Sequence, residues 1–101
     1  MRTVLVRYKT SEAQAEANAA LVRAVFEELR TSAPKDLRYA SYRLADGVMF
    51  IHIATIETPD KNPLTALASF KAFQKGLEER CVERPVVTEL TSVVGSYGVV
   101  A

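Results

Sequence analysis

A chain of 101 residues with 49% hydrophobic and 25% charged residues has the composition of one ordinary globular domain, spanning residues 1–101. The net charge of +1, from 13 basic and 12 acidic residues, excludes the strong positive field of proteins that bind nucleic acids or anionic membranes. A single cysteine excludes an internal disulfide and a cysteine-based metal site, and no acidic cluster in the sequence suits a hard metal.

The first third of the chain predicts a strand followed by a long helix. Residues 3–8 are rich in Val and Leu and predict the strand. Ser11 then offers a helix N-cap, and residues 12–32 contain no Gly or Pro. Their large apolar side chains recur at helical spacing and form one face of the predicted helix. Pro34 follows and ends it.

The middle of the chain predicts a β-hairpin. Residues 37–44 and 48–57 are the two strands, and Asp46-Gly47 lies between them. This dipeptide favours a two-residue type I′ turn, in which both central residues have positive φ.

The remaining residues predict a loop, a second helix and a last strand. The loop spans residues 58–63 and contains two prolines, and Asn62-Pro63 can cap and begin a helix that ends near Cys81. An extended segment runs from Val86 to Val94 or Tyr97. The resulting order, βαββαβ, predicts an α+β protein with the ferredoxin-like fold, a four-stranded antiparallel sheet with both helices on one face.

Apolar residues lie on both faces of the predicted sheet. Met49, Ile51 and Ile53 lie on one face of the third strand, and Phe50, Ala54 and Ile56 lie on the other. Two helices cover only one face, and an exposed apolar face of this size usually marks an interface. We therefore expect a homodimer whose two sheets close into an α+β barrel.

The hairpin register sorts side chains onto these two faces. A two-residue turn places three pairs opposite one another: Tyr39 with Ala54, Ser41 with His52, and Arg43 with Phe50. The alternate residues form the more aliphatic set, which we assign to the helices: Ala40, Tyr42, Leu44, Met49, Ile51 and Ile53. We assign the first set to the barrel side, together with Leu5 and Arg7, while Val4 and Val6 face the helices.

The strand order, the chain length and two segments resemble the antibiotic biosynthesis monooxygenase family of dimeric α+β barrels. These segments are Ala68-Ser69-Phe70-Lys71-Ala72-Phe73 and the run Glu-Arg-Pro-Val-Val-Thr-Glu-Leu at 83–90. The resemblance implies a small oxygenase that acts on a phenol or quinol without a cofactor or metal, in the cleft between sheet and helices. Several members of the family carry His or Trp on the second helix, and this chain has neither there.

His52 is the only histidine and the candidate general base, because a nearly neutral pKa lets it accept a phenolic proton. Arg7 and Arg43 could stabilise the resulting anion, or form salt bridges instead. The candidate substrate-binding residues are Tyr39, Ser41, Phe50, Asn62 and Phe70. The alternative role of Asn62 is a simple helix cap, which the sequence favours because Ala66 occupies the place where some similar oxygenases have a Trp, and the alternative role of Phe70 is in the core.

Two other functions are compatible with the same scaffold, because fold alone does not define chemistry. One is a non-oxidative isomerase or decarboxylase that uses His52 with Arg7 or Arg43. The other is a non-enzymatic, ligand-binding or stress-responsive dimer that holds a small aromatic molecule. The apolar runs are too short for a signal-peptide core or a membrane span, so we expect a cytoplasmic protein.

Overall fold

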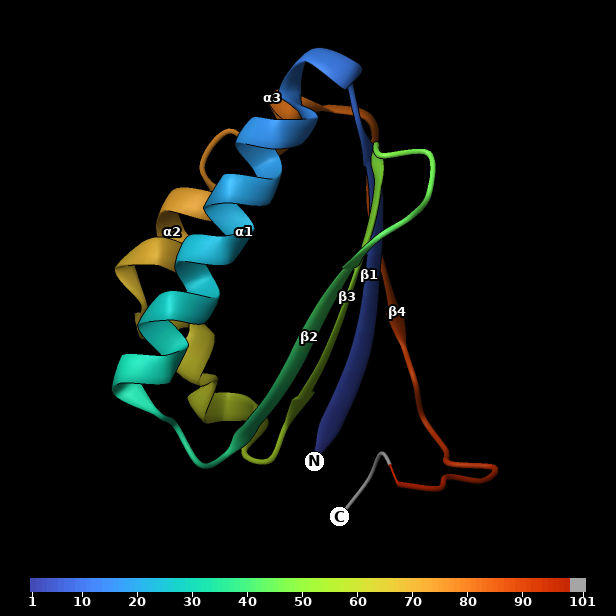
Figure 1. Ribbon diagram of the computed structural model, residues 1–101. Coiled ribbons are helices and arrows are strands. Elements are labelled where there is room, and N and C mark those ends of the chain that lie inside the picture. The colour runs from blue at the N-terminus through green and yellow to red at the C-terminus, as the bar shows by residue number, and fades with distance from the viewer. Residues whose placement is uncertain (99–101) are drawn as a thin grey trace.

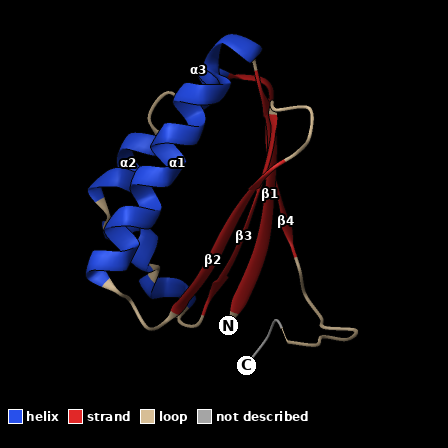
Figure 2. Cartoon of the chain, viewed as in Figure 1, coloured by secondary structure: helices blue, strands red, loops and turns tan. Residues whose placement is uncertain are grey.

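The computed structural model describes residues 1–98 and shows one antiparallel sheet with helices on a single face (Figure 1, Figure 2). The elements are β1 (Arg2–Thr10), α1 (Glu12–Ser32), β2 (Leu37–Arg43), β3 (Met49–Ile56), the 3-10 turns η1 (Pro59–Lys61) and η2 (Pro63–Ala66), α2 (Ala68–Gln74), α3 (Leu77–Arg80) and β4 (Cys81–Glu89). The strands lie in the order β2-β3-β1-β4, and every neighbouring pair is antiparallel. The predicted ferredoxin-like α+β fold is confirmed.

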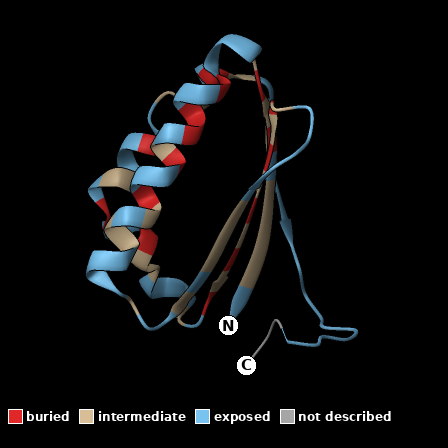
Figure 3. Cartoon of the chain, in the orientation of Figure 1, coloured by how far each residue is buried: buried red, intermediate tan, exposed pale blue. Residues whose placement is uncertain are grey.

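Helix α1 presents its buried stripe to the sheet, as Figure 3 shows. Its buried residues are Ala15, Asn18, Ala19, Val22 and Val25, which recur at the spacing of one helix face. Beyond Ser32 the chain turns through Ala33, which has a φ of 44° in the left-handed region usually occupied by glycine.

The hairpin has the predicted register but not the predicted turn. Arg43 lies opposite Phe50, as expected. Only Gly47 has positive φ, so the type I′ prediction is wrong. Instead the Gly47 amide donates to the Leu44 carbonyl oxygen at 2.9 Å, which closes a four-residue turn. The Asp46 carboxylate accepts hydrogen bonds from the backbone amides of Val48 and Met49, which hold the turn together without positive φ at Asp46.

The second predicted helix is divided into three pieces. Asn62 caps η2 by accepting a hydrogen bond from the Leu64 amide at 3.0 Å, so the capping role is confirmed. Helix α2 begins at Ala68, and the chain is then interrupted by Gly76, with a φ of 78°, before α3. The left-handed conformation at Gly76 cannot continue an α-helix, which explains the break.

The last strand begins and ends earlier than predicted. Strand β4 spans Cys81–Glu89, so residues 90–94 lie outside it. The sequence predicts an extended segment that starts at Val86, directly after Pro85. In the structure β4 is an edge strand, and the β1–β4 register shifts between Arg7 and Lys9, opposite the segment that contains Pro85. An edge strand tolerates proline there.

The side chains of the hairpin face the opposite way from the prediction. Phe50, His52, Ala54 and Ile56 are buried under the helices, whereas Met49, Ile51 and Ile53 are half-buried on the outer face. The predicted orientation of the first strand is confirmed, since Tyr8 is 1% exposed under the helices and Arg7 is exposed. The reversed assignment followed from giving the helices the more aliphatic face. The helices instead cover an aromatic face whose polar groups are hydrogen-bonded to one another.

None of the helices within residues 1–98 is both long enough and apolar enough to cross a membrane.

Candidate functional site

His52 lies at the centre of a buried hydrogen-bond network between sheet and helices. It is 3% exposed, and both ring nitrogens have partners. Nε2 lies 2.7 Å from the Tyr8 hydroxyl. Nδ1 lies 2.6 Å from Ser41 Oγ and 2.9 Å from the Tyr39 hydroxyl. The three partners come from β1 and β2, the strands on either side of β3, so the sheet register itself assembles this group.

The network continues from Tyr8 into the helices. Asn18 of α1 donates from Nδ2 to the Tyr8 hydroxyl at 2.8 Å. Arg80 of α3 donates from Nε to Asn18 Oδ1 at 3.0 Å, and its other nitrogens donate to the backbone carbonyls of Phe73 and Lys75. Asn18 is fully buried and Arg80 is 8% exposed. Hydrogen bonding within the core offsets the cost of burying these polar groups.

Aromatic rings surround the imidazole. The Tyr8 and His52 rings stack with centroids 5.3 Å apart, and the Tyr39 and His52 rings with centroids 5.9 Å apart. Phe73 of α2 lies 5.4 Å from His52 in a tilted arrangement, and Phe26 of α1 stacks on Tyr39 at 5.0 Å. These contacts fix the ring orientations and exclude water from the imidazole.

Burial shifts the ionisation of the three ring groups. It lowers the pKa of His52 from 6.5 to about 4, because the charged imidazolium is disfavoured away from water. It raises the pKa of the Tyr8 and Tyr39 phenols for the same reason. All three groups are therefore neutral near neutral pH, and His52 is a weaker base than an exposed histidine.

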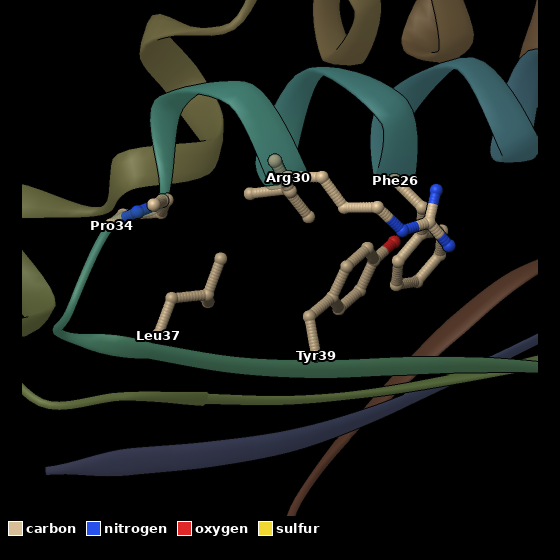
Figure 4. Close-up of a pocket in the computed structure, with 7 residues that line it drawn as sticks. Phe26, Arg30, Pro34, Leu37 and Tyr39 are labelled. Atoms are coloured by element: carbon tan, nitrogen blue, oxygen red, sulfur yellow. The ribbon is translucent and has the colours of Figure 1, made fainter.

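Two adjoining pockets lie between α1 and β2, and we call them together the α1–β2 cleft. The first measures about 230 Å³ and is lined by Phe26, Leu29, Arg30, Ala33, Pro34, Leu37 and Tyr39 (Figure 4). The second measures about 200 Å³, shares Phe26 with the first, and includes Ser41, Arg23, Arg43 and Phe50 in its lining. Figure 4 shows Leu37 and Tyr39 rising from β2 toward the helix, and Arg30 extending toward the Tyr39 hydroxyl.

The network therefore ends in the α1–β2 cleft. Tyr39 lines one pocket, Ser41 lines the other, and His52 lies directly behind both hydroxyls. Each volume lies below the usual range for drug-sized ligands, so the cleft is suited to a small molecule.

Two further predicted site residues, Phe50 and Arg43, line the α1–β2 cleft. Phe50 is buried and lines the second pocket, and the Arg43 guanidinium lies 5.6 Å from the centroid of its ring. Arg43 also forms a 2.8 Å salt bridge with Glu16, a partner the sequence did not indicate.

Three predicted residues lie away from the cleft. Arg7 is on the outer face of the sheet, opposite Ile51, so the structure does not bring it to His52. Asn62 caps η2, and Phe70 packs beside Phe73 with ring centroids 6.0 Å apart. Neither lines one of the two pockets.

Sequence reasoning missed Tyr8, Asn18 and Arg80. Asn18 carried a usable signal, because it lies on the apolar stripe of α1, where a polar side chain needs a buried partner. Arg80 carried none, because its burial depends on the break at Gly76. Within residues 1–98 no group of three or more His, Cys, Asp or Glu side chains is placed to hold a metal ion.

Comparison with solved structures identifies the class of fold. An antibiotic biosynthesis monooxygenase superposes with a TM-score of 0.75 at 16% identity, covering 92% of this chain and 99% of the other. The protein Rv0793 from Mycobacterium tuberculosis gives 0.75 at 19% identity, with 95% and 98% covered. A proposed antibiotic biosynthesis monooxygenase from Nitrosomonas europaea gives 0.75 at 17% identity, with 92% and 99% covered.

This chain therefore has the fold of the antibiotic biosynthesis monooxygenase structures, which confirms the resemblance stated from its sequence. No family model and no curated protein sequence matches the chain.

Proposed function

We propose that this protein is a small oxygenase of the antibiotic biosynthesis monooxygenase type, which acts without a cofactor on a phenol or quinol bound in the α1–β2 cleft. One observation carries the proposal: the Tyr39 and Ser41 hydroxyls line the cleft and both lie within 2.9 Å of a buried, neutral imidazole. Such hydroxyls can hold the oxygen of a phenolic substrate, while Phe26 and Leu37 contact its ring.

The reaction balances with oxygen as the only co-reactant. Loss of the hydroxyl proton gives a phenolate, which is electron-rich enough to donate an electron to O₂. Recombination forms a C–O bond at a ring carbon that bears hydrogen. The peroxide anion takes up one proton from solvent, which replaces the proton lost by the hydroxyl. Elimination of water then removes the hydrogen of that ring carbon, breaks the O–O bond and leaves a carbonyl, so the phenol and O₂ become a quinone and water. The protein must stabilise the anion and exclude bulk water.

The residues of the cleft divide this work. Tyr39 and Ser41 would contact the substrate oxygen, and His52 would act on it only through them, because its ring is 3% exposed. Arg30 lines the first pocket together with Tyr39 and adds positive charge to it. Arg7 was expected to stabilise the substrate anion, but it lies on the other face of the sheet and takes no part in this proposal.

Oxygen uptake on a panel of anthrones, naphthols and quinols, without added metal or flavin, tests the proposal. We expect turnover by the wild type and a loss of about 100-fold in kcat for Tyr39→Phe, the size found when one donor to a reacting oxygen is removed. Tyr97→Phe makes the same change at a ring that is 98% exposed beyond the sheet, and it should keep wild-type turnover.

Ligand binding without oxygen uptake would favour the non-enzymatic alternative. Release of carbon dioxide or isomerisation without oxygen uptake would favour the non-oxidative enzyme. Equal turnover by wild type and Tyr39→Phe would support an oxygenase but would show that the reaction does not take place in the α1–β2 cleft.

We also propose that the outer face of the sheet packs against a second copy of the chain. This face carries Met49, Ile51 and Ile53 half-buried and Tyr42 58% exposed, while Figure 1 shows the helices confined to the other face. Sedimentation should give a dimer for the wild type and a monomer for Ile53→Glu, because a buried unpaired carboxylate at the interface is costly. A monomeric wild type at micromolar concentration would exclude this assembly.

A further inference from the structure

The donor and acceptor roles along the buried hydrogen-bond network can be assigned in sequence, beginning from Arg80. A guanidinium can only donate hydrogen bonds, so the group that faces Arg80 Nε must be the amide oxygen of Asn18. The amide nitrogen of Asn18 then points at Tyr8, to which it donates. Within residues 1–98 no carboxylate forms an ion pair with Arg80, so its charge is held by the amide and two backbone carbonyls.

The hydrogen bonds of Tyr8 determine which nitrogen of His52 accepts. The Tyr8 oxygen accepts from Asn18, and among the described residues its own proton has one acceptor within reach, His52 Nε2 at 2.7 Å. Nε2 must then be unprotonated. A neutral imidazole carries one proton, which therefore lies on Nδ1 and points toward Ser41 and Tyr39.

The end of the hydrogen-bond network that borders the cleft is consequently a hydrogen-bond donor. His52 Nδ1–H donates to Ser41 Oγ, its nearer partner at 2.6 Å. The Tyr39 hydroxyl oxygen also faces the Nδ1–H, at 2.9 Å, which leaves the Tyr39 hydroxyl proton available to a ligand. The charged groups that line the cleft are Arg23, Arg30 and Arg43, of which Arg43 is paired with Glu16. A hydroxyl donor within a positively charged rim is complementary to an oxyanion.

We propose that Arg80, Asn18 and Tyr8 are positioning residues that hold His52 in its Nδ1–H tautomer, so that the cleft takes its phenolic ligand as the phenolate. The choice of a phenolic ligand rests on the proposed function, whereas the tautomer follows from the contacts alone. The proton of the ligand is then lost to solvent through the cleft rather than to His52, whose accepting nitrogen is occupied by Tyr8.

Nitrogen NMR of the wild type tests the tautomer directly. His52 is the only histidine, so one pair of imidazole ¹⁵N signals reports it without assignment variants. At about pH 8 we expect a protonated, pyrrole-type Nδ1 and an unprotonated, pyridine-type Nε2. A protonated Nε2, or an equal mixture of the two tautomers, would overturn the proposal.

Asn18→Asp should reverse the tautomer. The new carboxylate can accept from Arg80 but cannot donate to Tyr8, so Tyr8 would donate to it and accept from His52 Nε2–H instead. Asn62→Asp makes the same change at the η2 cap, away from the network, and should leave the wild-type signals unchanged. An unchanged His52 tautomer in folded Asn18→Asp would refute the positioning role, and the wild-type spectrum decides the tautomer even where this variant does not fold.

The ligand part is tested with 4-nitrophenol, whose anion absorbs visible light and whose neutral form does not. We expect the wild type to bind the anion about tenfold more tightly than the neutral phenol, because a hydrogen bond to a charged oxygen is the stronger one. Asn18→Asp should lose this preference. Tighter binding of the neutral form, or no binding at the solubility limit of the probe, would overturn the phenolate claim. Anion binding by a protein that consumes no oxygen would instead refute the proposed oxygenase and leave this inference intact.

Discussion

Lowering the pH from neutral should destabilise the protein through one buried side chain, His52. Its pKa is about 4 in the folded protein and 6.5 when exposed in the unfolded chain. Between these values the unfolded chain binds a proton that the folded protein does not bind. The free energy of unfolding is therefore highest above pH 6.5 and falls as the pH falls toward 4.

The size of this loss follows from the same two values. Each pH unit between them removes about 1.4 kcal/mol, so the contribution of His52 falls by about 2 kcal/mol on acidification to about pH 5 and by about 3 kcal/mol when complete. This is a substantial fraction of the stability of a small domain.

Urea unfolding of wild type and His52→Gln at a series of pH values isolates the effect. The carboxylates of Glu16, Glu28 and Asp46 have lowered pKa values of their own, but these titrate in both proteins and cancel in the difference. Parallel pH profiles for the two proteins would refute the reasoning. If the variant is too unstable to compare, an NMR titration of His52 in the wild type gives its folded pKa, and a value near 6.5 would refute it equally.

Three backbone positions give further predictions, each measured by chemical denaturation. Ala33→Gly should raise the free energy of unfolding by about 1 kcal/mol, because Ala33 holds a φ of 44° that glycine adopts without strain, and a lower stability would contradict this. Gly76→Ala should lower it by about 1 kcal/mol or more, since Gly76 has a φ of 78° and a Cβ there would lie 3.5 Å from Arg80 Nη1; an unchanged stability would show that α3 tolerates a different φ. Asp46→Ala should cost about 1 kcal/mol by removing two hydrogen bonds to the hairpin backbone, and Asp46→Asn, which keeps the acceptor, should cost less; equal losses would argue against those bonds.

The fold could be predicted from the sequence because local signals were consistent with one another. The period of the apolar residues in α1 and the Asp46-Gly47 turn between the two strand segments indicated the element types, and their order then left one common topology. The break at Gly76 was not predictable from spacing, because the apolar residues on its two sides remain compatible with one continuous helix. The early start of β4 depends on its place at the sheet edge, which follows from tertiary structure.

The candidate site was only partly predictable. The pairing of Ser41 with His52 followed from the hairpin, because the turn connects those strands directly. No short turn connects β1 to β3, so the pairing of Val6 with His52 could not be predicted from the sequence. That pairing places His52 on the same face as Val6 and Tyr8, under the helices. Without it, hydrophobicity alone decided the orientation, and it favoured the wrong face.

The alternation of β3 has a consequence for how this protein can diversify. Its even-numbered residues, among them Phe50 and His52, face the core and the cleft, while Met49, Ile51 and Ile53 face outward. Neighbouring residues of β3 thus belong to separate surfaces. A substitution at an even-numbered residue leaves the side chains of the odd-numbered residues in place, and the reverse also holds. Selection can therefore alter what the cleft accepts and what the outer sheet contacts in independent steps, along a single strand of eight residues.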